Sequence, residues 1–202
     1  MTNFFIHIPK NGGTSVTSYP NIIHYAHDRW KDIDKQITDI NTFFAVIRNP
    51  WARAVSRYVM GIPSYFHSPN DLVRKIVDKY GVSFNSFEEF LETRHIWVNE
   101  WFDPIRSWHT QYDYVCNEKD VVCCDILKLE NIDKELAPYL GTCLKSVVKE
   151  NVGEYTKDYK EYYNSKSIQI IADWYKKDID YWGFDFKYDW LNKGATKNTF
   201  FK

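Results

Sequence analysis

The sequence predicts one α/β domain in which a central, mostly parallel sheet is flanked by helices. The length of 202 residues is typical of a single domain, and no linker-like stretch divides the chain. Short apolar runs indicate strands that are buried on both faces, as in parallel sheets. These runs alternate with helical patterns, which is the order expected when helices connect parallel strands. We therefore predict that residues 1–202 form one domain of this class.

The first part of the chain contains two predicted strands and two predicted helices. Asn3–Ile8 is mostly apolar and ends at a proline and a Gly-Gly turn, which predicts a short buried strand. A short helix is expected to begin near Thr14 and to stop at Pro20. Asn21–Tyr25 has a second strand-like pattern. Isoleucines at three- to four-residue spacing predict a helix over Trp30–Ile40.

The strongest strand pattern comes next. Thr42–Ile47 reads TFFAVI, which predicts a fully buried strand. Pro50 suits the first position of a helix that continues through Trp51–Met60. A helical stretch over Asp71–Tyr80 ends at a glycine. Ser86, with a glutamate three residues later, forms a capping-box pattern that opens the helix SFEEFLETRH.

The last third of the chain repeats the alternation. Val121–Leu127 is predicted to be an apolar strand, and Asn131–Leu140 is expected to be helical and to stop at the following glycine. Apolar residues along one stripe predict a longer helix over Ser165–Trp182, closed by Gly183.

Composition and charge exclude several classes of protein. Apolar residues make up 44% of the chain and aromatic residues 18%, far more than a disordered chain carries. The 26 basic and 27 acidic residues leave a formal charge of −1, so no global field would draw the chain onto nucleic acid or an anionic membrane. An anionic ligand must therefore be bound at a local site.

The sequence also bears on compartment. No apolar run approaches the roughly 20 residues of a membrane helix, and the start lacks a signal-peptide pattern, so we expect a cytoplasmic protein without a membrane partner. The four cysteines, Cys116, Cys123, Cys124 and Cys143, contain no CxxC pair. Buried reduced thiols are therefore expected rather than disulfides or a zinc site.

The first predicted strand is followed by HIPKNGGTS, which has the features of an anion-binding loop. In parallel sheets, ligands bind where strands end and helices begin. Gly12 and Gly13 allow a tight turn against a ligand, Lys10 adds a charge, and Thr14 and Ser15 add hydroxyls at a helix N-terminus. The loop differs from the nucleoside triphosphate loop GxxxxGK[ST], because its lysine precedes the glycines and no Lys-Ser/Thr pair can hold Mg²⁺. The alternative is an ordinary Gly-Gly turn beside a surface lysine.

The strand Thr42–Ile47 runs into a second basic segment. Arg48 stands at the strand end, where its guanidinium can grip a phosphate. Ser56, eight residues on, is a candidate for the same phosphate, and Arg53 and Arg57 share a helix face. The alternative is a solvated basic helix. Two anion sites at neighbouring strand ends suit a nucleotide with both 5′- and 3′-phosphates.

At these two loops the chain resembles the sulfotransferases that use 3′-phosphoadenosine 5′-phosphosulfate (PAPS). HIPKNGGTS is similar to their 5′-phosphosulfate loop, often written PKTGGTS, and FFAVIRNPWARAVSRY is similar to their 3′-phosphate motif. The carbohydrate sulfotransferases, which include the heparan and chondroitin/dermatan sulfating enzymes, are the most similar branch. SFEEFL, WHTQYDYV, LKLENIDKEL and YKEYYN…DWYKKDIDYWGFDF follow in the family's order. The resemblance implies a P-loop-like α/β fold and metal-independent transfer of a sulfuryl group from PAPS to a hydroxyl.

The resemblance also implies a role for each residue of the two loops. The 5′ end of the donor would be held by Lys10, Asn11, Gly12, Gly13, Thr14 and Ser15. Arg48 and Ser56 would hold the 3′-phosphate of the donor and of the product, adenosine 3′,5′-bisphosphate. Asn11 stands where the family usually has threonine, and Pro20 makes the first helix shorter than in the relatives.

A histidine is expected to be the general base. The family's base usually follows the second strand, where this chain has His24 and His27. His27 aligns best with the family's histidine, and His24 is the competitor. The pKa of an imidazole lies close to neutral pH, which suits a base, and Lys10 would stabilise charge on the departing phosphate. The alternative is that His27 is a structural or surface histidine.

The implied acceptor is a glycan or another hydroxyl-bearing molecule. Trp108, His109 and Arg106 are candidates for binding it, because aromatic faces suit sugar rings and arginines suit acidic sugars. The alternative is that the aromatic residues of this region, which include Trp97 and Trp101, are packed in the core. Two other functions stay open. One is a small-molecule kinase that uses Mg-ATP through an atypical phosphate loop, and the other is a non-catalytic nucleotide-binding module.

Overall fold

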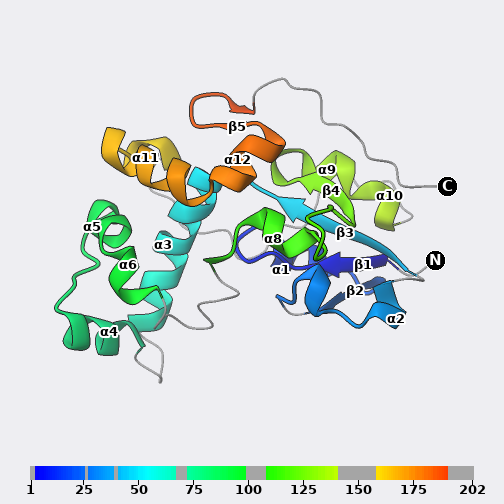
Figure 1. Ribbon diagram of the computed structural model, residues 1–202, viewed down its shortest axis with the longest axis horizontal. Helices are drawn as coiled ribbons and strands as arrows, with labels where there is room; N and C mark the ends of the chain where they lie inside the picture. Colours follow the sequence, from blue (N-terminus) through cyan, green and yellow to red (C-terminus); the bar gives the residue numbers. More distant parts are fainter. Residues whose placement is uncertain are drawn as a thin grey trace. The chain divides into compact units, whose positions relative to one another are not determined.

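The computed structural model describes residues 3–25, 27–38, 41–66, 72–98, 108–140 and 158–190. These residues form two compact units. The first contains the described residues up to Arg48 and those from His109 to Leu140. The second contains the described residues from Asn49 to Trp108 and residues 158–190. A sheet forms the centre of the first unit, and the second is mainly helical (Figure 1).

The sheet of the first unit has four parallel strands in the order β2-β1-β3-β4. They are β1 (Asn3–Ile6), β2 (Ile22–Tyr25), β3 (Thr42–Ile47) and β4 (Asp125–Lys128). A parallel sheet flanked by helices confirms the predicted α/β class. The chain leaves β1 toward one edge of the sheet and β3 toward the other, so the ends of these two central strands form a topological switch point. Ligands of parallel sheets bind at such points.

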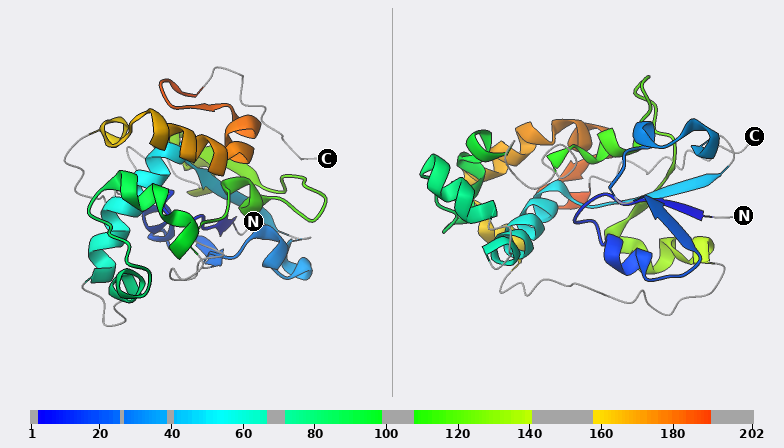
Figure 2. Two further views of the ribbon diagram at one scale, coloured as in Figure 1. Left: turned by 60° about the vertical axis from the view of Figure 1, so that its left-hand side comes forward. Right: turned by 90° about the horizontal axis from the view of Figure 1, so that it is seen from below.

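Helices cover both faces of this sheet. Besides its strands, the first unit contains α1 (Gly13–Thr17), η1 (Trp30–Asp32), α2 (Lys35–Thr38), α8 (Gln111–Val115), η2 (Leu129–Asn131), α9 (Ile132–Glu135) and α10 (Ala137–Leu140). The helices α1, α9 and α10 lie on one face, and α2 lies on the other (Figure 2). The helix α8 packs against η1.

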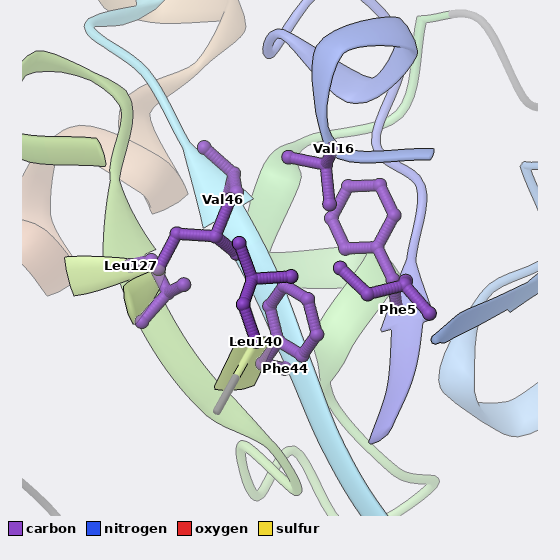
Figure 3. Close-up of a cluster of buried hydrophobic side chains, with 8 residues drawn as sticks. Phe5, Val16, Phe44, Val46, Leu127 and Leu140 are labelled. Atoms are coloured by element: carbon purple, nitrogen blue, oxygen red, sulfur yellow. The ribbon is translucent and has the colours of Figure 1, made fainter. Parts of the chain in front are cut away.

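The core of the first unit explains the unbroken apolar runs of its strands. Phe5, Phe44 and Val46 point to the face covered by α1 and pack with Val16 and Leu127 (Figure 3). The ring of Phe43, next to Phe44 in β3, instead lies 5.1 Å from that of Phe4 and 4.9 Å from that of Trp30. Successive side chains of a strand point to opposite faces of the sheet. Because both faces are buried here, apolar residues occupy successive positions, and the strand shows no alternation of apolar and polar residues.

The second unit is built from helices and one hairpin. Its elements are α3 (Pro50–Phe66), α4 (Leu72–Tyr80), α5 (Phe87–Glu92), α6 (Arg94–Trp97), η3 (Tyr159–Tyr162), α11 (Ser165–Trp174), α12 (Lys176–Trp182), β5 (Phe184–Asp185) and β6 (Asp189–Trp190). Asn49 caps α3, since its Oδ1 accepts hydrogen bonds from the N–H groups of Trp51 and Ala52 at 3.0 and 3.4 Å. Pro50 takes the first helical position, as predicted.

The aromatic residues of the second unit form its core. The rings of Trp108 and Trp174 stack at 5.1 Å, and the guanidinium groups of Arg57 and Arg94 lie 5.1 and 5.0 Å from their respective centres. Trp97 is fully buried beside Trp108. The prediction that the aromatic residues of this region are packed in the core is therefore confirmed for Trp97 and Trp108, whereas Trp101 lies outside the described residues.

The predicted helix Trp30–Ile40 is wrong as a single element. The 3₁₀ turn η1 ends at Asp32, the backbone of Ile33 is extended, and α2 begins at Lys35. The Asp34 carboxylate accepts a hydrogen bond from the N–H of Gln36 at 2.8 Å and so opens the new helix. The isoleucines keep helical spacing through this segment, but the backbone forms two separate elements, and the second begins at the Asp34 cap.

Two further predictions differ in their limits. The predicted helix Ser165–Trp182 is divided at Tyr175, whose buried ring stacks on the preceding tryptophan. In the predicted strand Val121–Leu127, Val122 instead forms an antiparallel bridge with Cys116, and β4 begins later. The helix α8 was not predicted, although its cap, a threonine hydroxyl that accepts from an N–H three residues on, is a readable signal.

The predictions about thiols and membranes concern the described residues only. Cys116, Cys123 and Cys124 carry free thiols; the predicted burial holds for Cys116, whereas Cys123 and Cys124 are half-buried, and Cys143 lies outside the described residues. Within the part of the chain that the structure describes, every helix is too short or too polar to cross a membrane.

Candidate functional site

The loop between β1 and α1 is a tight turn with unusual backbone angles. Lys10 and Gly12 have φ values of 70° and 74°, both in the left-handed region. A lysine there costs conformational energy, so the surrounding contacts must hold it in place. Gly12 is the N-cap of α1 and has no side chain to cap it. Thr14 is exposed, and the side chains of Lys10 and Ser15 are half-buried.

A buried hydrogen-bond network ties this loop to the end of β3. Asn11 is fully buried, and its Nδ2 donates to the carbonyl oxygen of Val46 at 2.8 Å and to Oε1 of Gln111 at 2.6 Å. The same Oε1 accepts from the N–H of Arg48 at 2.8 Å, and Nε2 of Gln111 donates to the Arg48 carbonyl, also at 2.8 Å. The Asn11 side chain therefore anchors the loop through Nδ2, while its buried Oδ1 has no hydrogen-bond partner within the described part of the chain.

The network brings the two predicted anion-binding loops together. Nη1 of Arg48 donates a hydrogen bond to the carbonyl oxygen of Lys10 at 3.2 Å. The basic ends of β1 and β3 are therefore neighbours at the switch point of the sheet. This juxtaposition is what a ligand with two anionic groups requires.

The remaining residues of the second motif belong to the second unit. Ser56 is buried in α3. Arg53 and Arg57 are only 4% and 8% exposed, and their guanidinium groups lie over the rings of Tyr175 and Trp108. The alternative of a solvated basic helix is therefore wrong for these two arginines.

The most informative residue that sequence analysis did not single out is His7. It follows β1 directly, and its ring centre lies 4.4 Å from that of His27 and 6.1 Å from that of His24. Burial, and then the charges of His27 and His24, lower the pKa of His7 to about 3. Its imidazole is therefore neutral at physiological pH. The one signal in the sequence is a polar residue at the carboxyl end of an apolar strand.

His27 is held in one orientation and one tautomer. Its backbone has a φ of 60°, and its Nδ1 lies 2.9 Å from the carbonyl oxygen of His7. A carbonyl oxygen only accepts, so Nδ1 carries the hydrogen, and Nε2 is the basic nitrogen of the neutral ring. This is the form that a general base needs. His24, by contrast, is exposed on the edge strand β2.

The candidates for acceptor binding lie in different surroundings. Nε2 of His109 lies 3.2 Å from Nη1 of Arg29. The other two nitrogens of that guanidinium, Nε and Nη2, donate to the two carboxylate oxygens of Asp32 at 2.7 and 3.1 Å. Burial and the Arg29 charge lower the pKa of His109. Trp108 belongs to the second unit and is 6% exposed, which leaves little of its ring for a sugar. Arg106 lies outside the described residues.

Gly13 is required by the position of His7. A Cβ atom built on Gly13 would lie 1.8 Å from Nε2 of His7. We expect Gly13→Ala to lower the free energy of unfolding by about 1–3 kcal/mol, although alanine is the better helix former, because the ring must leave its buried position. Chemical denaturation measures this loss.

Two further variants isolate the cause of that loss. In the double variant Gly13→Ala/His7→Ala, the loss of unfolding free energy should be much smaller than the sum of the two single losses, because removing the ring makes room for the methyl group. Gly81→Ala is the matched control, since Gly81 has a φ of 64° and nothing within 4 Å of its Cβ position. It should lose only about 1 kcal/mol of conformational energy. A fully stable Gly13→Ala variant would contradict the packing described here.

The half-buried His7 also predicts a pH dependence of stability. In the unfolded chain His7 binds a proton below its ordinary pKa of 6.5, whereas in the folded chain it stays neutral down to about 3. Stability is therefore complete above pH 6.5 and falls as the pH drops through this window, by up to about 1.4 kcal/mol per pH unit. Urea denaturation at several pH values should show that His7→Phe removes this part of the slope. An unchanged slope would show that His7 titrates normally.

Comparison with known proteins adds no assignment. No family model, no curated protein and no solved structure matches the chain. Among the described residues, no group of three or more His, Cys, Asp or Glu side chains could hold a metal ion. The chemistry of the site must therefore be argued from its own residues.

Proposed function

We propose that this chain is a PAPS-dependent sulfotransferase with a P-loop-like fold, which transfers a sulfuryl group to a hydroxyl of a carbohydrate or related acceptor. The observation that carries the proposal is the 3.2 Å hydrogen bond from the Arg48 guanidinium to the Lys10 carbonyl. It joins a basic residue from each of two loops at the switch point, where parallel sheets bind nucleotides. Two loops that each carry a basic residue and meet in this way suit a nucleotide that carries phosphate at both its 5′ and 3′ ends.

The residues of the first unit fit such a donor. Lys10 and the glycine turn after it supply a charge and a close backbone approach for the 5′-phosphosulfate. Arg48 keeps a planar set of donors for the 3′-phosphate beyond the one that it gives to Lys10. Ser56, which the resemblance also assigns to that phosphate, belongs to the second unit.

The proposed chemistry assigns one proton transfer and one charge contact to the protein. When bound, the donor supplies a sulfuryl group whose bond to the 5′-phosphate oxygen breaks, with the electron pair left on that oxygen, as the bond to the acceptor oxygen forms. Nε2 of His27 takes the proton of the acceptor hydroxyl, because Nδ1 is committed to the His7 carbonyl. The Lys10 ammonium stabilises the negative charge that develops on the departing phosphate.

Calorimetry separates this function from the alternatives. The proposal predicts that adenosine 3′,5′-bisphosphate binds in EDTA and that Mg-ATP binds weakly. The reverse preference would indicate a kinase. Radiolabelled PAPS with a panel of sugar and other hydroxyl acceptors then tests transfer, and tight binding without transfer to any acceptor would favour a non-catalytic module.

A further inference from the structure

We infer that Gln111 is a positioning residue that sets the spacing of the two anion-binding loops and thereby selects nucleotides phosphorylated at both ends. The inference rests on the proposed function, because it concerns the same ligand. It assigns to Gln111 no contact with the nucleotide. Its action would pass through Asn11 on one loop and through the backbone of Arg48 on the other.

The first support is the set of hydrogen bonds that one side chain makes. Oε1 of Gln111 accepts from Nδ2 of Asn11 at 2.6 Å and from the N–H of Arg48 at 2.8 Å, while Nε2 donates to the Arg48 carbonyl at 2.8 Å. Gln111 is fully buried, so water does not compete for these bonds. The amide fixes both polar backbone groups of Arg48 relative to the residue next to Lys10.

The second support is the rigidity of the element that carries Gln111. It is the first residue of α8, and the hydroxyl of Thr110 caps that helix by accepting from the N–H of Asp113 at 3.1 Å. The next residue, Tyr112, is buried, and its hydroxyl donates to the carbonyl of Asp120. The amide of Gln111 is therefore presented from a packed helix rather than from a mobile loop.

A fixed spacing matters only to a ligand that uses both loops. Once one phosphate is bound, the second binds as if at a high effective concentration, provided that its partner is already in place. A ligand with one phosphate gains nothing from the spacing. Loosening the two loops should therefore weaken binding of the bisphosphate far more than binding of a monophosphate.

The test measures two nucleotides on one substitution. Gln111→Met keeps the length of the side chain and removes its hydrogen bonds. By calorimetry in EDTA, we expect the affinity for adenosine 3′,5′-bisphosphate to fall about 10- to 100-fold and that for adenosine 5′-phosphate by less than about 3-fold. Gln36→Met, at an exposed position of α2, is the matched control and should leave both affinities unchanged.

Several outcomes would overturn the inference. Equal losses for the two nucleotides would make Gln111 a merely structural residue, and unchanged affinities would remove it from the site. If Gln111→Met does not fold, Gln111→Asn keeps the amide but shortens the side chain by one methylene, and it should shift the same ratio in the same direction. If the native chain binds neither nucleotide, the proposed function fails. In that case hydrogen exchange of the backbone amides tests the positioning role by itself. Gln111→Met should speed exchange of the Arg48 N–H, and an unchanged exchange rate would refute the role.

Discussion

Replacing Lys10 by alanine is expected to lower kcat for sulfuryl transfer by about 10²- to 10³-fold, the usual loss when one group that stabilises developing charge is removed. The lysine lies in the turn after β1, and its carbonyl is held by Arg48. Under the proposed function, its ammonium is the charge of the loop that would face the leaving phosphate. Steady-state kinetics with a fixed acceptor and saturating PAPS measures the effect.

The structure suggests how to separate this catalytic loss from misfolding. Alanine and lysine both pay for a left-handed φ of 70°, so the turn itself should persist. Binding of adenosine 3′,5′-bisphosphate should weaken much less than kcat falls, because the ammonium acts mainly on charge that appears during transfer. Lys35→Ala, at an exposed position of α2, is the control and should be fully active. An unchanged kcat in Lys10→Ala would remove the lysine from the chemistry.

Replacing His27 by asparagine should lower kcat by about 10²- to 10⁴-fold and leave affinity for the bisphosphate nearly intact. Asparagine is the informative substitution because it tolerates the φ of 60° that His27 adopts, whereas alanine would add strain. The loss should be smaller at high pH, where the acceptor hydroxyl needs less help to lose its proton. A pH profile of kcat for the variant and for the native chain tests this.

His24→Asn is the matched variant for that experiment. His24 lies within the same histidine cluster but is exposed on the edge strand β2, and it should retain most of the activity. A fully active His27→Asn enzyme beside an inactive His24→Asn enzyme would exchange the two roles. Loss of nucleotide binding in His27→Asn would indicate a structural role for the imidazole.

The sheet was predictable because burial leaves a plain signature in the sequence. TFFAVI is apolar throughout since both of its faces are covered, and β3 has the limits that were predicted. Helix breaks were not predictable from apolar spacing, because Ile33 and Tyr175 keep that spacing while neighbouring side chains change the backbone. Tertiary contacts decide such positions, and the period of the pattern does not report them.

The candidate site divides in the same way. The motifs around Lys10 and Arg48 pointed to the two loops that the structure brings together. The residues that hold these loops left no local signal. Gln111 lies 63 positions from Arg48, and only the fold makes them partners. His7 was not predicted because its position depends on Gly13, which has no side chain and so leaves room for the imidazole ring.

The left-handed backbone of Lys10 has a consequence for reuse of the loop. An isolated nonapeptide HIPKNGGTS would rarely adopt this conformation, because outside the folded protein no contacts offset the conformational free energy of the left-handed lysine. Its affinity for phosphate should then be a small fraction of the affinity that the proposed function requires of the intact protein. Grafting these nine residues onto a foreign scaffold should transfer the charge but lose the geometry, unless Gln111, the buried amide partner of Asn11, is grafted as well.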